Sequence, residues 1–145
     1  MSEVAFFDTN ILVYTDDSSS RRKQAAAIAL WKEYRKAKCA AISLQVMQEY
    51  YSVATRKLGL NPELAQRKVE LLAHARVVRF DERDVIAAIE IHRLNQISFW
   101  DAMILHAAAL SGATVLFSED LQAGYQRGGI RVVNPFAEFP RAERA

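Results

Sequence analysis

The sequence predicts an α/β fold in which a mostly parallel sheet is covered by helices. Two short, strongly apolar runs, Val4–Phe7 and Thr114–Phe117, are typical of the central strands of such a sheet. Segments with helical periodicity, many of them preceded by capping residues, separate the predicted strands along the chain. Strands that alternate with helices favour a parallel sheet with right-handed crossover connections.

The first half of the chain alternates strands with well-capped helices. Asp8-Thr9-Asn10 can cap a short helix after the first strand, and Ser43 can cap the helix after the second. Asn61-Pro62 is a typical helix start, with Asn at the cap and Pro at the first position. The predicted elements are a strand at 4–7, a short helix from 11, a helix at 21–37, a strand at 40–42, a helix from 44 to about 58, and a helix from 62. For the helix at 21–37 we assign the apolar stripe to Ala25, Ile28, Ala29, Trp31 and Tyr34.

The second half repeats this alternation and ends in a charged tail. Asp81 and Ser98 are the expected caps of two helices. Gly124, Gly128 and Gly129 lack a phosphate-loop lysine and are interpreted as a flexible loop. The predicted elements are a strand at 77–80, a helix from 82 to about 94, a helix at 99–110, and strands at 114–117 and 130–133. We expect one domain over residues 1–140, with a tail at 141–145.

Composition excludes several classes of protein. The chain has 145 residues, 51% of them hydrophobic and 25% charged, as expected of a soluble domain with a core. Its net charge is +2, so any basic surface for nucleic acid must be local. Cys39 is the single cysteine, which excludes an intrachain disulfide and a thiolate metal cage. No apolar run approaches the ~18 residues of a membrane span, and we expect a cytoplasmic protein.

Acidic residues follow two of the predicted strands directly. Asp8 follows Phe7, and Glu119 and Asp120 follow the strand that ends at Phe117. In open α/β sheets, ligands bind beyond the carboxyl ends of the strands. Of two further acids, Glu49 lies about two turns into the helix after the second strand, and Asp101 lies in the first turn of its predicted helix.

Each acid also has a structural interpretation. The role of Asp8 could be simply to cap a helix, and that of Asp101 could be simply to interact with a helix dipole. Glu49 can point to water, and Glu119 and Asp120 can belong to a solvated turn. Taken together, however, acids gathered at one crevice repel one another unless a cation or protons offset the charge. Oxygen ligands suit Mg²⁺ or Mn²⁺, and such ions can support displacement at a phosphodiester.

The chain resembles the PIN-domain ribonucleases, and in particular the VapC-type toxins of toxin–antitoxin pairs. Four short motifs, in this order and at these positions against the strands, carry the likeness. They are Phe7-Asp8-Thr9-Asn10-Ile11-Leu12, Ser43-Leu44-Gln45-Val46-Met47-Gln48-Glu49, Ser98-Phe99-Trp100-Asp101-Ala102 and Leu116-Phe117-Ser118-Glu119-Asp120-Leu121.

The resemblance implies a three-layer α/β/α fold and an Mg²⁺-dependent endoribonuclease, with Mn²⁺ as an alternative ion. It also implies a homodimer and a small antitoxin partner. Asp8, Glu49 and Asp101 would be the core acids, and Asp120 or Glu119 the fourth. Thr9, Asn10 and Ser118 would support these acids from behind. Contacts with RNA could come from Arg21, Arg22, Lys23 and Arg127, although a solvated basic face is the simpler interpretation of the first three.

Two alternative functions remain open. An Mg²⁺-dependent phosphatase of the haloacid-dehalogenase type also begins with an acid after its first strand. Such enzymes place an aspartate two residues further on as the general acid, where this chain has Asn10, whose amide cannot deliver a proton. The second alternative is a regulatory or nucleic-acid-binding module that keeps the PIN fold without catalysis, although all the acidic positions of the family are filled.

Overall fold

A single twisted sheet runs through the protein. The computed structural model describes residues 3–122 and 126–137. Within these ranges the strand order is β3-β2-β1-β4-β6-β5, and only β5 runs antiparallel to its neighbour. The strands are β1 (Ala5–Phe7), β2 (Ala40–Ser43), β3 (Arg76–Val78), β4 (Val115–Phe117), β5 (Gln126–Arg127) and β6 (Ile130–Val133).

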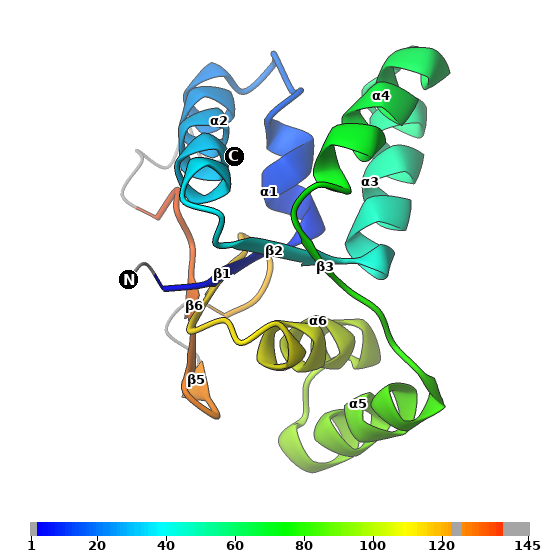
Figure 1. Ribbon diagram of the computed structural model, residues 1–145, viewed down its shortest axis with the longest axis vertical. Helices are drawn as coiled ribbons and strands as arrows, with labels where there is room; N and C mark the ends of the chain where they lie inside the picture. The colour runs from blue at the N-terminus through cyan, green and yellow to red at the C-terminus, as the bar shows by residue number, and fades with distance from the viewer. Residues whose placement is uncertain (1–2, 123–125, 138–145) are drawn as a thin grey trace.

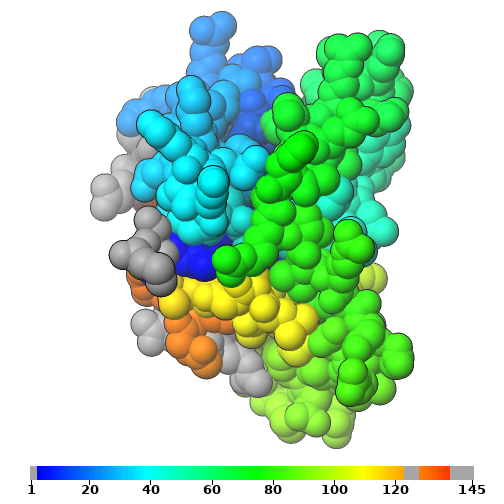
Figure 2. Space-filling model, in the orientation of Figure 1, coloured from blue at the N-terminus to red at the C-terminus, as the bar shows by residue number. Residues whose placement is uncertain are grey.

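Helices cover the sheet on both faces and make the fold a three-layer α/β/α sandwich, which confirms the predicted class. Helices α1 to α4 lie on one face of the sheet and α5 and α6 on the other (Figure 1). The space-filling view shows that the helices hide most of the central strands (Figure 2). The helices are α1 (Thr9–Tyr14), α2 (Arg21–Lys36), α3 (Leu44–Arg56), α4 (Pro62–Leu72), α5 (Glu82–Asn95) and α6 (Phe99–Leu110).

The predicted helix starts are confirmed where a side chain caps the helix. Ser43 Oγ accepts a hydrogen bond from Val46 N–H at 3.2 Å at the start of α3. Asp81 forms a reciprocal capping box with Asp84 at the start of α5. Ser98 caps α6 in the same way as Ser43 caps α3. These bonds satisfy backbone N–H donors that the first turn of a helix leaves unpaired, and so they fix the residue at which each helix begins.

The glycine-rich segment after β4 differs from the predicted flexible loop. Gln126 and Arg127 form β5, which pairs with β6 through a hairpin. Gly128 and Gly129 are its two turn residues, with φ of 56° and 84°. Positive φ at both positions is what a tight hairpin turn requires, and glycine adopts it without strain. Gly124 and the predicted tail from residue 141 lie outside the described residues.

The predicted apolar stripe of α2 is confirmed for Trp31 and Tyr34, which pack against the core, but not for its other three members. Ile28 is 44% exposed, and Ala25 and Ala29 are also exposed. The fully buried residues of this helix are Ala27 and, unexpectedly, Lys23. The helix is therefore rotated so that a lysine, which the sequence suggested would be solvated, points into the protein.

The core lies on both sides of β1 and β4. Phe6, Phe7, Ile42 and Leu116 are completely buried, as expected for strands covered on both faces. Cys39 is buried too, and its Sγ contacts the carbonyl oxygen of Tyr34. None of the helices in the described ranges combines the length and the apolar character that crossing a membrane requires.

Candidate active site

The parallel pairing of β1 with β4 brings two acidic segments together. Phe7 pairs with Phe117 in the register of the two strands, so Asp8 and Ser118 leave the sheet at the same level. The N–H of Asp8 donates to the carbonyl oxygen of Phe117 at 3.0 Å and extends this ladder by one residue. The predicted meeting of Asp8 with the segment after β4 is therefore observed.

Asp8 is a buried carboxylate held by uncharged donors. Its Oδ1 accepts from Thr9 N–H and its Oδ2 from the Ser118 hydroxyl, both at 2.8 Å. The pKa of Asp8 is raised from 3.8 to about 6, chiefly by burial and to a smaller extent by the charges of Asp120 and Glu49, against the lowering effect of the two hydrogen bonds. The negative charge at this position is therefore poorly compensated by the protein itself.

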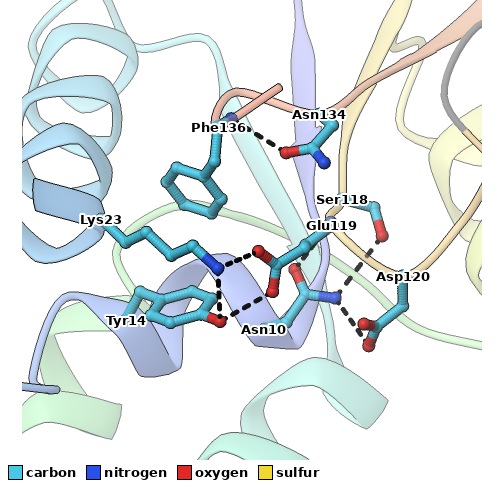
Figure 3. A network of polar contacts seen from close by, with 8 residues as sticks. All are labelled: Asn10, Tyr14, Lys23, Ser118, Glu119, Asp120, Asn134 and Phe136. Carbon is cyan, nitrogen blue, oxygen red and sulfur yellow. Dashed lines mark hydrogen bonds and ion pairs between the residues drawn. The ribbon is translucent and has the colours of Figure 1, made fainter. Parts of the chain in front are cut away.

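Asn10 holds the turn that follows β4. Its Nδ2 donates to Asp120 Oδ2 at 3.0 Å, and its Oδ1 accepts from the backbone N–H of Glu119 at 3.2 Å (Figure 3). A weaker contact of 3.5 Å joins Nδ2 to Ser118 Oγ. Because both atoms of the amide are engaged, the orientation of Asp120 is fixed from the first turn of α1.

Glu119 points in a different direction from Asp120 and is electrically compensated. Lys23 Nζ lies 2.6 Å from Glu119 Oε2, and the Tyr14 hydroxyl donates to Oε1 at 2.7 Å (Figure 3). The interpretation of Lys23 as part of a solvated basic face is wrong, because its side chain is only 1% exposed. Arg21 and Arg22 are exposed at the start of α2, whereas the side chain of Arg127 lies outside the described part of the chain.

The two remaining predicted acids differ in their surroundings. Glu49 lies on α3, lines the same cleft as Asp120, and accepts a hydrogen bond from Gln45 Nε2 at 2.8 Å. Asp101 lies in the first turn of α6, where its N–H is capped by Ser98 Oγ at 3.0 Å. Asp101 is not among the residues that line the cleft. Asp8, Glu49 and Asp120 form one electrostatic cluster, because the charges of Glu49 and Asp120 help to raise the pKa of Asp8.

A cleft of about 520 Å³ opens over this cluster. Lys57 also lines it, and the sequence analysis did not identify this residue. A signal was present, because Glu49, Val53 and Lys57 are spaced four apart and therefore share one face of α3. The lining residues are Thr9, Asn10, Val13, Tyr14, Asp17, Ser19, Glu49, Val53, Lys57, Leu58, Glu119 and Asp120.

The donor chemistry of this cleft fits a hard divalent cation. Carboxylate oxygens are the preferred ligands of Mg²⁺ and Mn²⁺. Thr9 Oγ1 is buried beside Asp8 and has no hydrogen-bond partner among the described residues, so the site contains an unsatisfied oxygen. Over residues 3–122 and 126–137, no three acidic, histidine or cysteine side chains converge closely enough to hold an ion. Mg²⁺ usually keeps several waters and binds through one or two carboxylates, so such an ion does not need three converging side chains.

The raised pKa of Asp8 predicts that Asp8→Asn stabilises the protein in the presence of a chelator. The folded state binds a proton at Asp8 more tightly than the unfolded chain, so the stability of the wild type falls as the pH rises from about 4 to about 6 and stays low above that. Thermal unfolding should therefore show an advantage of Asp8→Asn over wild type that is roughly 2 kcal/mol larger at pH 8 than at pH 4.5. An advantage of equal size at both pH values would contradict this account.

Solved structures with this fold include toxins of toxin–antitoxin systems. The chain is 25% identical to a chain of a toxin–antitoxin complex from Klebsiella pneumoniae, with a TM-score of 0.65 over 90% of this chain and 97% of that one. The chain is 22% identical to Mycobacterium tuberculosis VapC20, a toxin that cleaves the sarcin–ricin loop, with a TM-score of 0.64 over 80% of this chain and 91% of that one. It is 21% identical to a chain of DNA-bound VapBC from Salmonella typhimurium, with a TM-score of 0.61 over 90% of this chain and 97% of that one.

The family assignment rests on the sequence itself. A search of curated proteins gives no significant match. The sequence model of the PIN domain, in contrast, matches residues 5–125, which include β1 to β4 and every acid of the candidate site. The chain therefore belongs to the PIN domain family and has the fold of the VapC toxins.

Proposed function

We propose that this protein is a divalent-cation-dependent endoribonuclease and the toxin of a toxin–antitoxin pair. Membership of the PIN family supports nuclease activity for this protein. The observation that carries the proposal is the buried carboxylate of Asp8, which lies beside the charges of Asp120 and Glu49. Its hydrogen bonds come from a backbone N–H and a hydroxyl group, and neither carries a charge. Such a site gains stability from a bound cation.

Asp8, Glu49 and Asp120 are the residues that we propose as ligands, directly or through water. Asp101, in the first turn of α6, stays a predicted fourth ligand. Mg²⁺ is the expected ion and Mn²⁺ an alternative, because both accept the same oxygen ligands. When bound, such an ion supplies a polarised water and neutralises charge on a phosphodiester.

The side chains around these acids would act by orientation. Ser118 donates to Asp8 and keeps one carboxylate oxygen in a fixed direction. Asn10 does the same for Asp120. Supporting hydrogen bonds of this kind keep acidic ligands ordered before a cation binds and lower the cost of forming the site. Thr9, whose hydroxyl is buried in the site, could turn it toward a bound water.

Lys57 is the residue that we propose for the first contact with the RNA backbone. This residue is exposed and lines a cleft that contains the acids Asp17, Glu49 and Asp120 in addition to the paired Glu119. A phosphate that approaches the acids needs a compensating positive charge at close range. Arg21 and Arg22, which are exposed at the start of α2, are further candidates for more distant phosphates.

We propose two protein partners, a small antitoxin and a second copy of the chain. The solved complexes from Klebsiella pneumoniae and Salmonella typhimurium support the first, because they are described as a toxin–antitoxin complex and as VapBC bound to DNA. If a small protein is encoded beside this gene, it is expected to inhibit the nuclease when the two are mixed. Failure of that protein to bind or inhibit would count against an antitoxin. The molar mass in solution tests the homodimer.

The phosphatase alternative is disfavoured by the surroundings of Asn10. Both atoms of its amide are engaged, by Asp120 and by the backbone of Glu119, so this position supports a turn and cannot deliver a proton. A catalytically silent module predicts Mn²⁺-independent binding of nucleic acid instead. The assay below separates that alternative from the nuclease.

Removal of the central acid is expected to abolish RNA cleavage. In a nuclease assay titrated with Mg²⁺ or Mn²⁺, the wild type should cut single-stranded RNA, and Asp8→Asn or Asp120→Asn should reduce the rate at least a hundredfold. A chelator should have the same effect on the wild type. If Asp8→Asn cuts RNA as fast as the wild type does, the proposed site is wrong.

Charge reversal at Lys57 is expected to weaken substrate binding rather than chemistry. Lys57→Glu should raise KM for RNA by about tenfold and reduce the salt dependence of binding by about one counterion, with little change in kcat. Lys36→Glu is the matched control, because Lys36 is also an exposed lysine. It lies at the end of α2, just before the amino end of β2, whereas the candidate site lies beyond the carboxyl ends of the strands. Equal effects of the two reversals on KM would argue against a local contact at Lys57.

A further inference from the structure

Lys23 is a buried cation beside the candidate site that the proposed chemistry does not use. It extends from the buried face of α2 toward the turn after β4 (Figure 3). Its Nζ lies 2.6 Å from Glu119 Oε2 and 3.3 Å from the hydroxyl of Tyr14. The rings of Tyr14 and Phe136 stand 5.0 and 5.6 Å from the ammonium group and help to enclose it.

Both oxygens of the Glu119 carboxylate are used in this arrangement. Oε2 accepts from Lys23 and Oε1 from Tyr14. Phe136 is completely buried and packs edge-on against Tyr14, which limits access of water to these bonds. A buried ion pair is rarely the most stabilising choice, because apolar side chains of similar volume often give a protein at least as stable. The Lys23–Glu119 pair therefore calls for an explanation other than stability.

The backbone of Glu119 connects this ion pair to the acid cluster. Its N–H donates to Asn10 Oδ1, while Asn10 Nδ2 donates to Asp120 Oδ2. Ser118, on the other side of Glu119, donates to Asp8. Asn10 therefore holds both the backbone of Glu119 and the carboxylate of Asp120, while Lys23 and Tyr14 hold the Glu119 side chain. An anchored Glu119 restrains the turn from which Asp120 extends.

We propose that Lys23, together with Tyr14, is a positioning residue of the cation site. By binding Glu119 it neutralises that carboxylate, holds it in a direction different from that of Asp120 and restrains the turn Ser118–Asp120, so that Asp120 is the acid presented beside Asp8. The inference rests on the proposed function, because it assigns a role at the cation site of that nuclease. It also gives a physical answer to which of the two adjacent acids serves as the ligand.

A second lysine in the same fold provides a matched control. Lys68 on α4 also pairs with an acid, with Nζ 3.0 Å from Asp16 Oδ2, and it lies 5.5 Å from the ring of Tyr50. The Tyr50 hydroxyl donates to the same carboxylate oxygen at 2.7 Å. The Lys68–Asp16–Tyr50 group has the chemistry of the Lys23–Glu119–Tyr14 group, but none of its members lines the cleft.

Mn²⁺ binding measured by calorimetry tests the proposal without any need for RNA cleavage. Lys23→Met should weaken Mn²⁺ binding roughly 10- to 100-fold, as is usual when a group that orients a ligand is lost. Lys68→Met should leave the affinity unchanged. The double variant Lys23→Met with Glu119→Gln should recover most of the affinity, because it removes the uncompensated carboxylate and leaves an amide that can still bond to Tyr14.

A milder pair of variants covers the case in which Lys23→Met does not fold. Tyr14→Phe removes one of the two bonds to Glu119 and should weaken Mn²⁺ binding, whereas Tyr50→Phe, which removes the equivalent bond to Asp16, should not. Thermal unfolding of every variant confirms that it is folded at the assay temperature. In the RNA assay, kcat should fall for the Lys23 and Tyr14 variants with little change in KM.

The outcomes separate this inference from the proposed function. A wild type that binds no Mn²⁺ would overturn the proposed cation site itself. A wild type that binds Mn²⁺, with Lys23→Met binding it as tightly as Lys68→Met or more tightly, would leave the nuclease intact and overturn the positioning role. Equal losses for Tyr14→Phe and Tyr50→Phe would do the same, because the effect would then be one of general stability.

Discussion

The parallel pairing of β1 with β4 is the constraint on which the candidate site depends. These strands adjoin in the sheet although more than a hundred residues separate them in sequence, and the Phe7–Phe117 register sets Asp8 level with Ser118. A slip of one residue would turn every side chain of β1 to the opposite face. Because both strands are buried on both faces, apolar packing fixes the register tightly. The positions of the acids are therefore consequences of core formation.

The site contains two acids that the protein treats in opposite ways. Asp8 is stripped of water and receives only neutral donors, so its pKa rises to about 6 and its charge remains costly. Glu119 is given a lysine and a tyrosine hydroxyl, which compensate its charge within the fold. Adjacent acids, such as Glu119 and Asp120, can thus differ in function when only one of them is paired. Under the proposed function, the uncompensated charge of the cluster is the part of the site that a cation would neutralise, and functional sites often carry such unfavourable electrostatics.

The fold was predictable from local signals, whereas the site was predictable only in part. Apolar runs located β1 and β4, and the caps Ser43, Asp81 and Ser98 located three helices, because these signals depend on a few neighbouring residues. The burial of Lys23 could not be read from α2 alone, since its partner Glu119 comes from the other end of the chain. The approach of Asp101 to the other acids depends on how α6 packs against the sheet, which periodicity does not encode. Strand β5 was not predicted, because a strand of two residues is too short to show an alternating pattern.

Phe136 gives the folding unit a boundary that differs from that of the family match. The PIN sequence model ends at residue 125, yet β6 pairs with β4, and Phe136 closes the apolar cover over Lys23 and Tyr14. The last strand and the residues just after it therefore belong to the same cooperative unit as the first helix. Trimming the chain at the family boundary would expose one edge of β4 to pairing with other chains and would admit water to the Lys23–Glu119 pair. Fragments for crystallography or library screening should accordingly keep at least residues 3–137.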